Sequence, residues 1–79
     1  MKLTVRIALK KSILDPQGEA ISASLKSLGF EKVNSVRQGK IIEIDINETD
    51  SKKGLKIADK MCSELLVNNV IETYSVEVG

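Results

Sequence analysis

The sequence contains no histidine, no tryptophan and only one cysteine, Cys62. Without histidine, the commonest general base in enzymes is absent, so a hydrolase or transferase site would depend on carboxylates or lysine. A single cysteine excludes an intramolecular disulfide and is typical of a reducing compartment. One cysteine and scattered carboxylates cannot assemble the usual transition-metal sites, and we predict that the chain binds no metal.

Aromatic side chains are almost as scarce, because Phe30 and Tyr74 are the only two. The core must therefore consist of Ile, Leu, Val and Ala. A domain of 79 residues buries only about 60% of the surface that its unfolded chain exposes, so its stability is marginal. Apolar area shared with a partner would add stability, which predicts a homodimer, a larger homo-oligomer or a subunit of a complex.

Neither sign of charge dominates, since 12 Lys and Arg residues against 11 Asp and Glu residues give a formal charge of +1. The charges are dispersed, which argues against a nucleic-acid or membrane partner. The first residues lack the apolar run of a signal peptide, and no stretch approaches the roughly 18 apolar residues of a membrane span. We expect a cytoplasmic protein.

The first two predicted elements are a strand and a helix. Apolar and polar residues alternate over 2–10, which is the period of a strand with one buried face. Asp15 can cap a helix that has Pro16 at its first position, and Gly29 can adopt the left-handed conformation that ends it. Phe30 is expected to pack back under the end of this helix.

Two further strands, a second helix and a last strand are expected in the rest of the chain. Residues 33–37 and 40–47 predict strands joined by a hairpin at Gln38-Gly39. Residues 52–67 predict a helix, and 71–78 the last strand. The buried face of the second helix is expected to consist of Leu55, Ala58, Cys62 and Leu65.

The element order β-α-β-β-α-β is that of a ferredoxin-like α+β sandwich, in which two helices cover one face of a four-stranded antiparallel sheet. No linker or repeat interrupts it, so residues 1–79 are predicted to form a single domain. The uncovered face is expected to be polar and to meet water or a wet interface. It would carry Thr4, Arg6, Ala8, Glu43, Asp45, Ser75 and Glu77.

Few residues are candidates for catalysis. Cys62 falls on the apolar stripe of a helix, and reactive cysteines are instead partly exposed in electropositive surroundings. Glu43 and Asp45 share one strand face and could form a carboxylate pair with Arg6 as the counter-charge. Such residues are more often the solvated side of a sheet.

The loop Leu14-Asp15-Pro16-Gln17-Gly18 contains residues that a helix start does not require, because capping needs neither Gln17 nor Gly18. Glycine in a first helical turn costs about 1 kcal/mol relative to alanine, so Gly18 suggests that a partner backbone approaches closely. Arg37 and Lys40 flank the predicted hairpin turn and could bind a phosphate or carboxylate, although a solvated turn or a protein contact is the commoner role.

Together with several later segments of the chain, this loop resembles the PurS family, the small subunit of bacterial and archaeal phosphoribosylformylglycinamidine synthase. The similarity spans essentially the whole chain. The residues that carry it are Leu9-Lys10, Leu14-Asp15-Pro16-Gln17-Gly18, Ala20, Leu28-Gly29, Val36-Arg37, Gly39-Lys40, Ile42-Glu43-Ile44, Leu65-Leu66-Val67-Asn68 and Val70-Ile71-Glu72. Asn69 departs from the family pattern, which frequently has proline there.

The resemblance implies a subunit without an active site of its own, which joins a large ATP-dependent synthetase subunit to a glutaminase subunit and supports ammonia transfer between them. The complex is a carbon–nitrogen ligase of purine (IMP) biosynthesis, with glutamine as the amido donor. ATP and Mg²⁺ would be used by the synthetase subunit, and no cofactor by this chain. The family's small subunit also forms homodimers.

We interpret two segments as partner contacts, because they contain more polar and charged residues than folding requires. They are the 10–18 loop and the predicted hairpin tip at 37–40. The residues expected to contact partners are Lys11, Asp15, Pro16, Gln17, Gly18, Arg37, Gly39 and Lys40.

Two alternatives from other classes remain open. The ferredoxin-like frame also serves homodimeric regulatory domains that bind a small ligand such as an amino acid. It further serves small acylphosphatase-like enzymes, which have an arginine in the first loop and an asparagine on a strand. Here the first loop contains Lys10 and Lys11 instead.

Overall fold

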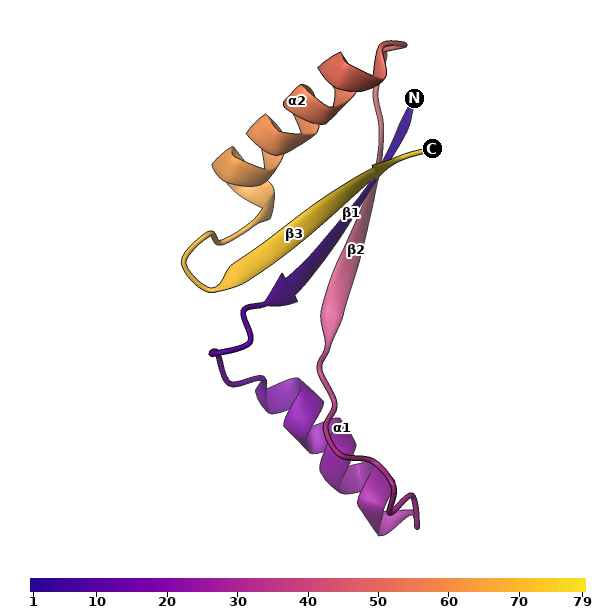
Figure 1. Cartoon of the computed structure of the whole chain (residues 1–79), viewed down its shortest axis with the longest axis vertical. Coiled ribbons are helices and arrows are strands. Elements are labelled where there is room, and N and C mark those ends of the chain that lie inside the picture. Colours follow the sequence, from indigo (N-terminus) through magenta and orange to yellow (C-terminus); the bar gives the residue numbers. More distant parts are fainter.

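The computed structural model describes residues 1–79 and contains a three-stranded antiparallel sheet with two helices (Figure 1). This arrangement confirms the α+β class. None of the helices is long and apolar enough to span a membrane. In chain order, the elements are β1 (Lys2–Leu9), α1 (Pro16–Ser27), β2 (Gly39–Asp45), α2 (Ser51–Met61), the π-helical turn η1 (Cys62–Leu66) and β3 (Glu72–Val78).

β1 is the central strand of the sheet, whose order is β2-β1-β3. Val5 illustrates the register, since it lies opposite Ile42 on β2 and Val76 on β3. The predicted alternation of β1 is confirmed, because Leu3, Val5 and Ile7 are buried on the side of α2 and η1 and the residues between them are not. The buried apolar residues of the whole chain are Leu3, Val5, Ile7, Ala58, Cys62 and Val67.

The strand expected at 33–37 does not form, and there is no hairpin at Gln38-Gly39. Instead, the chain runs on from 33–38 into β2 without reversing its direction (Figure 1). None of the backbone groups of 32–37 takes part in a backbone hydrogen bond. The prediction of a fourth strand was wrong for the single chain, because an extended segment becomes a strand only when another strand pairs with it.

α1 also departs from the expected sandwich, because it does not cover the sheet. It lies at the opposite end of the molecule from α2 and packs against residues 33–37 (Figure 1). The Cα radius of gyration is 16.0 Å, whereas a compact chain of this length has a value of about 12 Å. We call residues 16–38 the arm, and the sheet with α2 and η1 the body.

The ends of α1 are those that the sequence predicts. Asp15 caps its start, and Gly29, with φ of 99°, ends it. The amide of Gly29 donates to the Lys26 carbonyl and that of Phe30 to the Leu25 carbonyl, both at 3.0 Å, which is the Schellman pattern. The Phe30 side chain is nevertheless 57% exposed, because no sheet lies under this end of the helix.

The second helix changes its pitch near its end. α2 gives way to η1, in which the Val67 amide donates to the Cys62 carbonyl five residues earlier. A π turn holds more residues per turn than an α-helix and so rotates the following side chains. Ala58 and Cys62 are buried as predicted. Leu55 is 39% exposed and Leu65 83% exposed, contrary to the prediction, and Val67 is buried instead.

Candidate functional site

The two segments that the sequence singles out as contact surfaces lie side by side. Residues 10–18 lead from β1 into α1, and residues 36–40 lead from the arm into β2 (Figure 1). Side chains from each segment bind the backbone of the other. We call this region, residues 10–18 and 36–40, the junction. It sets how the arm is attached to the body.

Asp15 is the centre of the junction. Its Oδ1 accepts a hydrogen bond from the Gly18 amide at 2.9 Å, and its Oδ2 accepts one from the Gln38 amide at 2.7 Å. The residue is only 3% exposed. One carboxylate therefore caps α1 and also anchors the C-terminal end of the arm. The amide of Gln38, and then that of Gly18, stabilise the ionised form and lower the pKa of Asp15.

Gly18 is required by a close approach within the chain. A Cβ atom at this position would clash with the Val36 carbonyl oxygen and would lie 2.8 Å from Oδ2 of Asp15. The sequence suggested a partner backbone at this point. The structure corrects this interpretation, because the backbone that approaches Gly18 is that of Val36, 18 residues further along the same chain.

Arg37 was expected to flank a hairpin turn. In the structure it binds the loop between β1 and α1. Its guanidinium donates to the Lys10 carbonyl and to the Ile13 carbonyl, both at 2.9 Å. These two carbonyls belong to the loop between β1 and α1, and that of Lys10 also accepts from the Ile13 amide. Arg37 therefore stabilises the loop and fixes its orientation, instead of standing at a hairpin tip.

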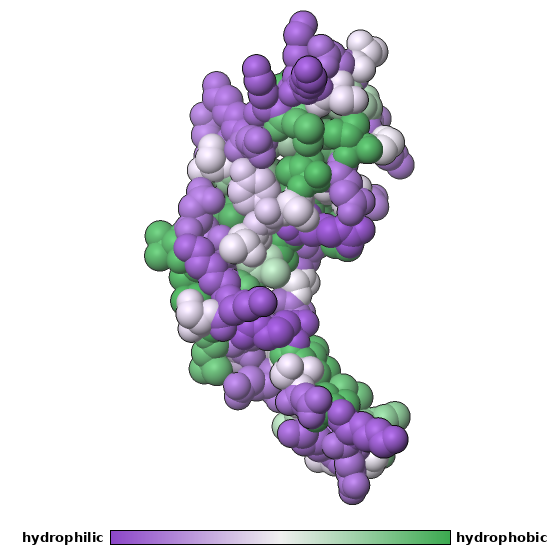
Figure 2. All heavy atoms as spheres, viewed as in Figure 1, coloured by the Kyte–Doolittle hydropathy of each residue, from purple (hydrophilic) through white to green (hydrophobic).

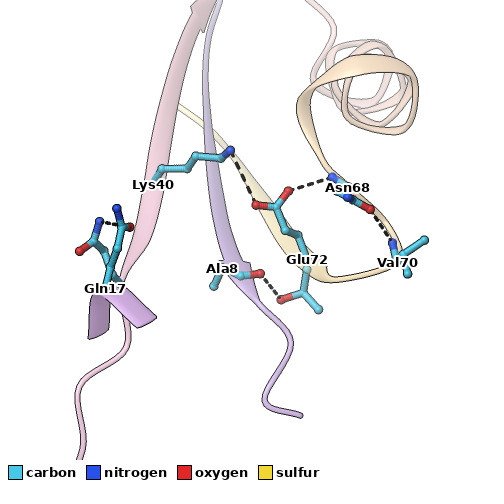
Figure 3. Close-up of polar contacts among 8 residues, drawn as sticks. Ala8, Gln17, Lys40, Asn68, Val70 and Glu72 are labelled. Carbon is cyan, nitrogen blue, oxygen red and sulfur yellow. Dashed lines mark hydrogen bonds and ion pairs between the residues drawn. The ribbon is translucent and has the colours of Figure 1, made fainter. Parts of the chain in front are cut away.

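Lys40 and Glu72 connect the junction to the last strand (Figure 3). The Lys40 ammonium lies 3.7 Å from Oε2 of Glu72, while Oε1 of Glu72 accepts from the Asn68 amide at 2.8 Å. On the other side of the junction, the Gln38 amide group donates to the Gln17 side chain at 2.8 Å. A polar hollow of about 260 Å³ lies beside β1, and its lining includes Asp15, Gln17, Gln38, Lys40 and Glu72.

The predicted contact residues fall into two groups. Asp15 and Gly18 are buried, and Arg37 is occupied by backbone carbonyls, so these three shape the junction. The others are exposed on its surface: Lys11, Pro16, Gln17, Gly39 and Lys40. Sequence reasoning missed Gln38 and Glu72. The only signal for Gln38 was its place in a supposed turn, which concealed its bond to Asp15.

The other candidate groups are held in structural contacts. Burial raises the pKa of the Cys62 thiol, which is fully buried. Arg6 pairs with Glu77, with 3.1 Å between Nε and Oε1, and not with the carboxylates of β2. The Tyr74 hydroxyl donates to Asp59, which raises the pKa of the tyrosine. No cluster of His, Cys, Asp or Glu in the structure could hold a metal ion.

Acid is expected to loosen the junction through Asp15. Because the folded-state pKa is lowered, the carboxylate stabilises the fold above its unfolded pKa of about 3.9, and this contribution is lost as the pH falls through the folded value. We expect the melting temperature of the parent to fall below about pH 4, and Asp15→Asn to lose this component. Thermal unfolding from pH 2 to 7 measures both.

The matched control is Asp50→Asn, because Asp50 caps α2 through the Lys52 amide but has no contact with the junction. This variant is expected to keep the acid-dependent loss of the parent. If the melting temperature of Asp15→Asn falls with pH as steeply as that of the parent down to pH 2, the acid sensitivity comes from other carboxylates and the prediction is wrong.

Comparison with known proteins gives a consistent result across sequence and structure. The model of a family described as "PurS: Phosphoribosylformylglycinamidine (FGAM) synthase" matches residues 2–79. The FGAM synthase subunit PurS of Bacillus subtilis is 42% identical over 77 residues, which cover 98% of this chain and 90% of the relative.

Two solved structures show the same architecture. The crystal structure of Methanocaldococcus jannaschii PurS, a subunit of formylglycinamide ribonucleotide amidotransferase, matches with a TM-score of 0.89 and 41% identity over 99% of this chain and 94% of that one. A chain of the Thermotoga maritima PurLQS structure matches with a TM-score of 0.87 and 33% identity, over 96% and 93% of the two chains.

Proposed function

The chain belongs to the PurS family, whose members are subunits of FGAM synthase in purine biosynthesis, and from this premise we propose that it joins the two catalytic subunits of that ligase. One partner is the ATP-dependent synthetase subunit, and the other is the glutaminase subunit. By holding them together, the chain supports the transfer of ammonia from glutamine to the synthetase site. The observation that carries this proposal is the full-length match to PurS, which includes a chain of a PurLQS structure.

This chain is a structural subunit in the proposal. It has no histidine, and its only thiol is buried and has a raised pKa, so it lacks the nucleophile and base that a glutaminase needs. ATP and Mg²⁺ belong to the synthetase subunit, and this chain binds no cofactor. A cytoplasmic location remains a prediction. The amino-acid-binding and acylphosphatase-like alternatives are not favoured by the family match.

The chain also forms a homo-oligomer in this proposal. The core of the body is small, yet four large apolar side chains of the arm and of the loop before it are exposed. They are Leu14 (66%), Ile21 (39%), Leu28 (74%) and Phe30 (57%). Figure 2 shows apolar surface along the arm as well as on the body. Apolar side chains that gather on one exposed part of a small protein favour a contact with another chain, which adds stability.

The junction surface is the proposed contact with the catalytic subunits. Lys11 is exposed and has no ion-pair partner, and the side chain of Lys40 is 56% exposed. We expect Lys11→Ala with Lys40→Ala to raise the dissociation constant of the complex by roughly three- to thirtyfold, because charges at the edge of an interface contribute modestly. Glutamine-dependent turnover at limiting concentration of this chain measures the effect.

Turnover with ammonia in place of glutamine is the internal control, because it needs no transfer between subunits. Lys52→Ala with Lys56→Ala is the matched variant, since both lysines are exposed on α2, away from the junction. Omission of this chain should abolish glutamine-dependent turnover alone, and unchanged turnover without it would contradict the bridging function. Equal effects of the two double variants would contradict only the contact surface.

A further inference from the structure

The hydrogen-bond ladder between β1 and β2 ends before β1 does. In an antiparallel ladder, every second pair of residues exchanges backbone hydrogen bonds, and the pair of Met1 and Ile46 does so. Continued in steps of two, the same register reaches Leu9 and Gln38. That pair does not form, because the Gln38 amide donates to Oδ2 of Asp15 instead. The N–H and C=O of Leu9 are therefore left without a partner on the side of β2.

Leu9 lines the polar hollow of about 260 Å³ beside β1. The wall of the hollow also contains Asp15, which is only 3% exposed, and the side-chain amides of Gln17 and Gln38, which are joined at 2.8 Å. Backbone groups that face such a hollow must bond to water or to a ligand, because an unpaired polar group out of contact with water is costly. The hollow therefore has hydrogen-bonding capacity that the chain itself does not use.

Two oppositely charged side chains, Lys40 and Glu72, form the rim of the hollow. Nζ of Lys40 lies 3.7 Å from Oε2 of Glu72, and the two side chains are 56% and 17% exposed. In Figure 3 the Lys40 side chain reaches across β1 to Glu72. The hollow thus combines donors and acceptors with charges of both signs, which suits a polar group of mixed character better than a simple anion or cation.

The gap in the ladder is one residue long, which limits what can fill it. On one side of the gap, Ile7 pairs with Lys40 on β2. On the other side, the chain leaves the sheet, and the Lys10 carbonyl already accepts from Arg37. A further strand needs several free residues in a row, so it cannot pair here. The hollow is also smaller than the roughly 300–1,000 Å³ of pockets for drug-sized ligands, which excludes a nucleotide.

A primary carboxamide satisfies both backbone groups of Leu9 at once. Its NH₂ group donates to the Leu9 carbonyl while its oxygen accepts from the Leu9 amide, and these are the two bonds that a residue of a neighbouring strand would make. A carboxylate has acceptors only, so it would leave the Leu9 carbonyl unpaired and would stand beside the Asp15 carboxylate. An ammonium group has donors only and would leave the Leu9 amide unpaired.

We propose that this hollow is a binding subsite for a primary carboxamide group, which takes the place opposite Leu9 that Gln38 leaves empty. The carboxamide comes either from a small amino acid such as glutamine or asparagine, with its charged end against Lys40 and Glu72, or from an Asn or Gln side chain of another chain that covers the junction. The subsite goes beyond the proposed bridging function, and it is tested on this chain alone, so its failure leaves that function standing.

Acetamide is the first probe, because it consists of the carboxamide and a single methyl group. In NMR spectra of the isotope-labelled full chain, the amide signal of Leu9 is expected to shift and to saturate as acetamide is added. Acetate at the same concentration and ionic strength is expected to bind about tenfold more weakly, since it cannot donate to the Leu9 carbonyl. Equal shifts with both probes, or no shift of Leu9 with acetamide, would overturn the subsite.

Glutamine distinguishes the two sources of the carboxamide. Binding of glutamine that is about tenfold or more tighter than that of acetamide identifies a free amino acid as the ligand, because Lys40 and Glu72 then add charge-assisted contacts. Binding of glutamine at the level of acetamide identifies a side chain of another chain as the source. Glutamate is the matched control, since it differs only in the carboxamide, and a shift of Leu9 with glutamate equal to that with glutamine would contradict the proposal.

A variant places the binding in the hollow. Gln17→Trp puts a large ring at an exposed position of its lining and is expected to abolish the shift of Leu9 with acetamide. Glu19→Trp, exposed on α1 but outside this hollow, is the matched control and should keep the shift. A full response in Gln17→Trp would mean that acetamide binds elsewhere. If Gln17→Trp fails to fold, the comparison of acetamide with acetate on the parent decides the matter.

Discussion

Gly18→Ala is expected to destabilise the protein by about 1–3 kcal/mol, which is the cost of an added methyl group in a site without room for it. The methyl group would clash with the Val36 carbonyl oxygen and lie against the Asp15 carboxylate. Relief of the clash must move residues 36–38 away and weaken the bond between Asp15 and the Gln38 amide. Urea unfolding of parent and variant at one protein concentration measures the difference.

The sign of this change is diagnostic. At a helical position with free space, replacing glycine by alanine stabilises by about 1 kcal/mol. A more stable Gly18→Ala would therefore show that the arm does not approach α1 at this point. Ala20→Gly, at an exposed position two residues further along α1, is the matched control and should cost about 1 kcal/mol through helix propensity alone.

Ile7→Ala is expected to destabilise by about 2–5 kcal/mol, the usual cost of truncating a buried isoleucine. Ile7 is only 2% exposed and packs with Val5, Cys62 and Val67 in the core cluster of the body. The loss is a large part of the stability of so small a domain, so the variant is expected to be partly unfolded at 37 °C. Circular dichroism with urea titration, at a fixed concentration of the chain, measures it.

Leu65→Ala is the matched control, because it truncates an apolar residue that the sequence pattern assigns to the core. Leu65 lies in the π turn and is 83% exposed, so its truncation should change the free energy of unfolding by no more than about 0.5 kcal/mol. A cost equal to that of Ile7→Ala would mean that the helix continues as an α-helix and buries Leu65.

Features that depend on neighbouring residues could be predicted from the sequence. The Asp15 and Pro16 start of α1 and its end at Gly29 follow from local hydrogen bonds and backbone conformation, and the structure contains both. The alternation over β1 and in β3 also indicated their buried faces correctly. In each case the conformation is set by residues within one or two turns or along one strand, so the local sequence pattern is enough to predict it.

Features that depend on distant partners could not be predicted in the same way. Residues 33–37 have strand-like composition, but whether they pair depends on a strand edge beside them, and in the single chain no strand lies there. The rotation of Leu65 out of the core follows from one extra residue in a helical turn, which no periodicity shows in advance. Both errors concern geometry that residues elsewhere impose.

The residues singled out in the sequence lie together in the junction, and their role as partner contacts stays a prediction. Asp15, Gly18 and Arg37 all lie in the junction, and all contact other parts of the same chain. The sequence indicated that these residues make specific contacts, since a carboxylate, a guanidinium and a helical glycine are more than a plain loop needs. That Gln38 and Val36 complete these contacts depends on the course of the arm, which returns along α1.

The central place of β1 has a consequence for how the chain is made. β1 is synthesised early, yet one of its two neighbours is β3, at residues 72–78. During translation the first strand therefore emerges with its apolar face uncovered, and the sheet closes only after nearly all other residues have left the ribosome. α1 is formed from near neighbours in sequence and can fold while the sheet is still open. The order of synthesis thus favours a nascent chain in which α1 of the arm folds before the sheet of the body.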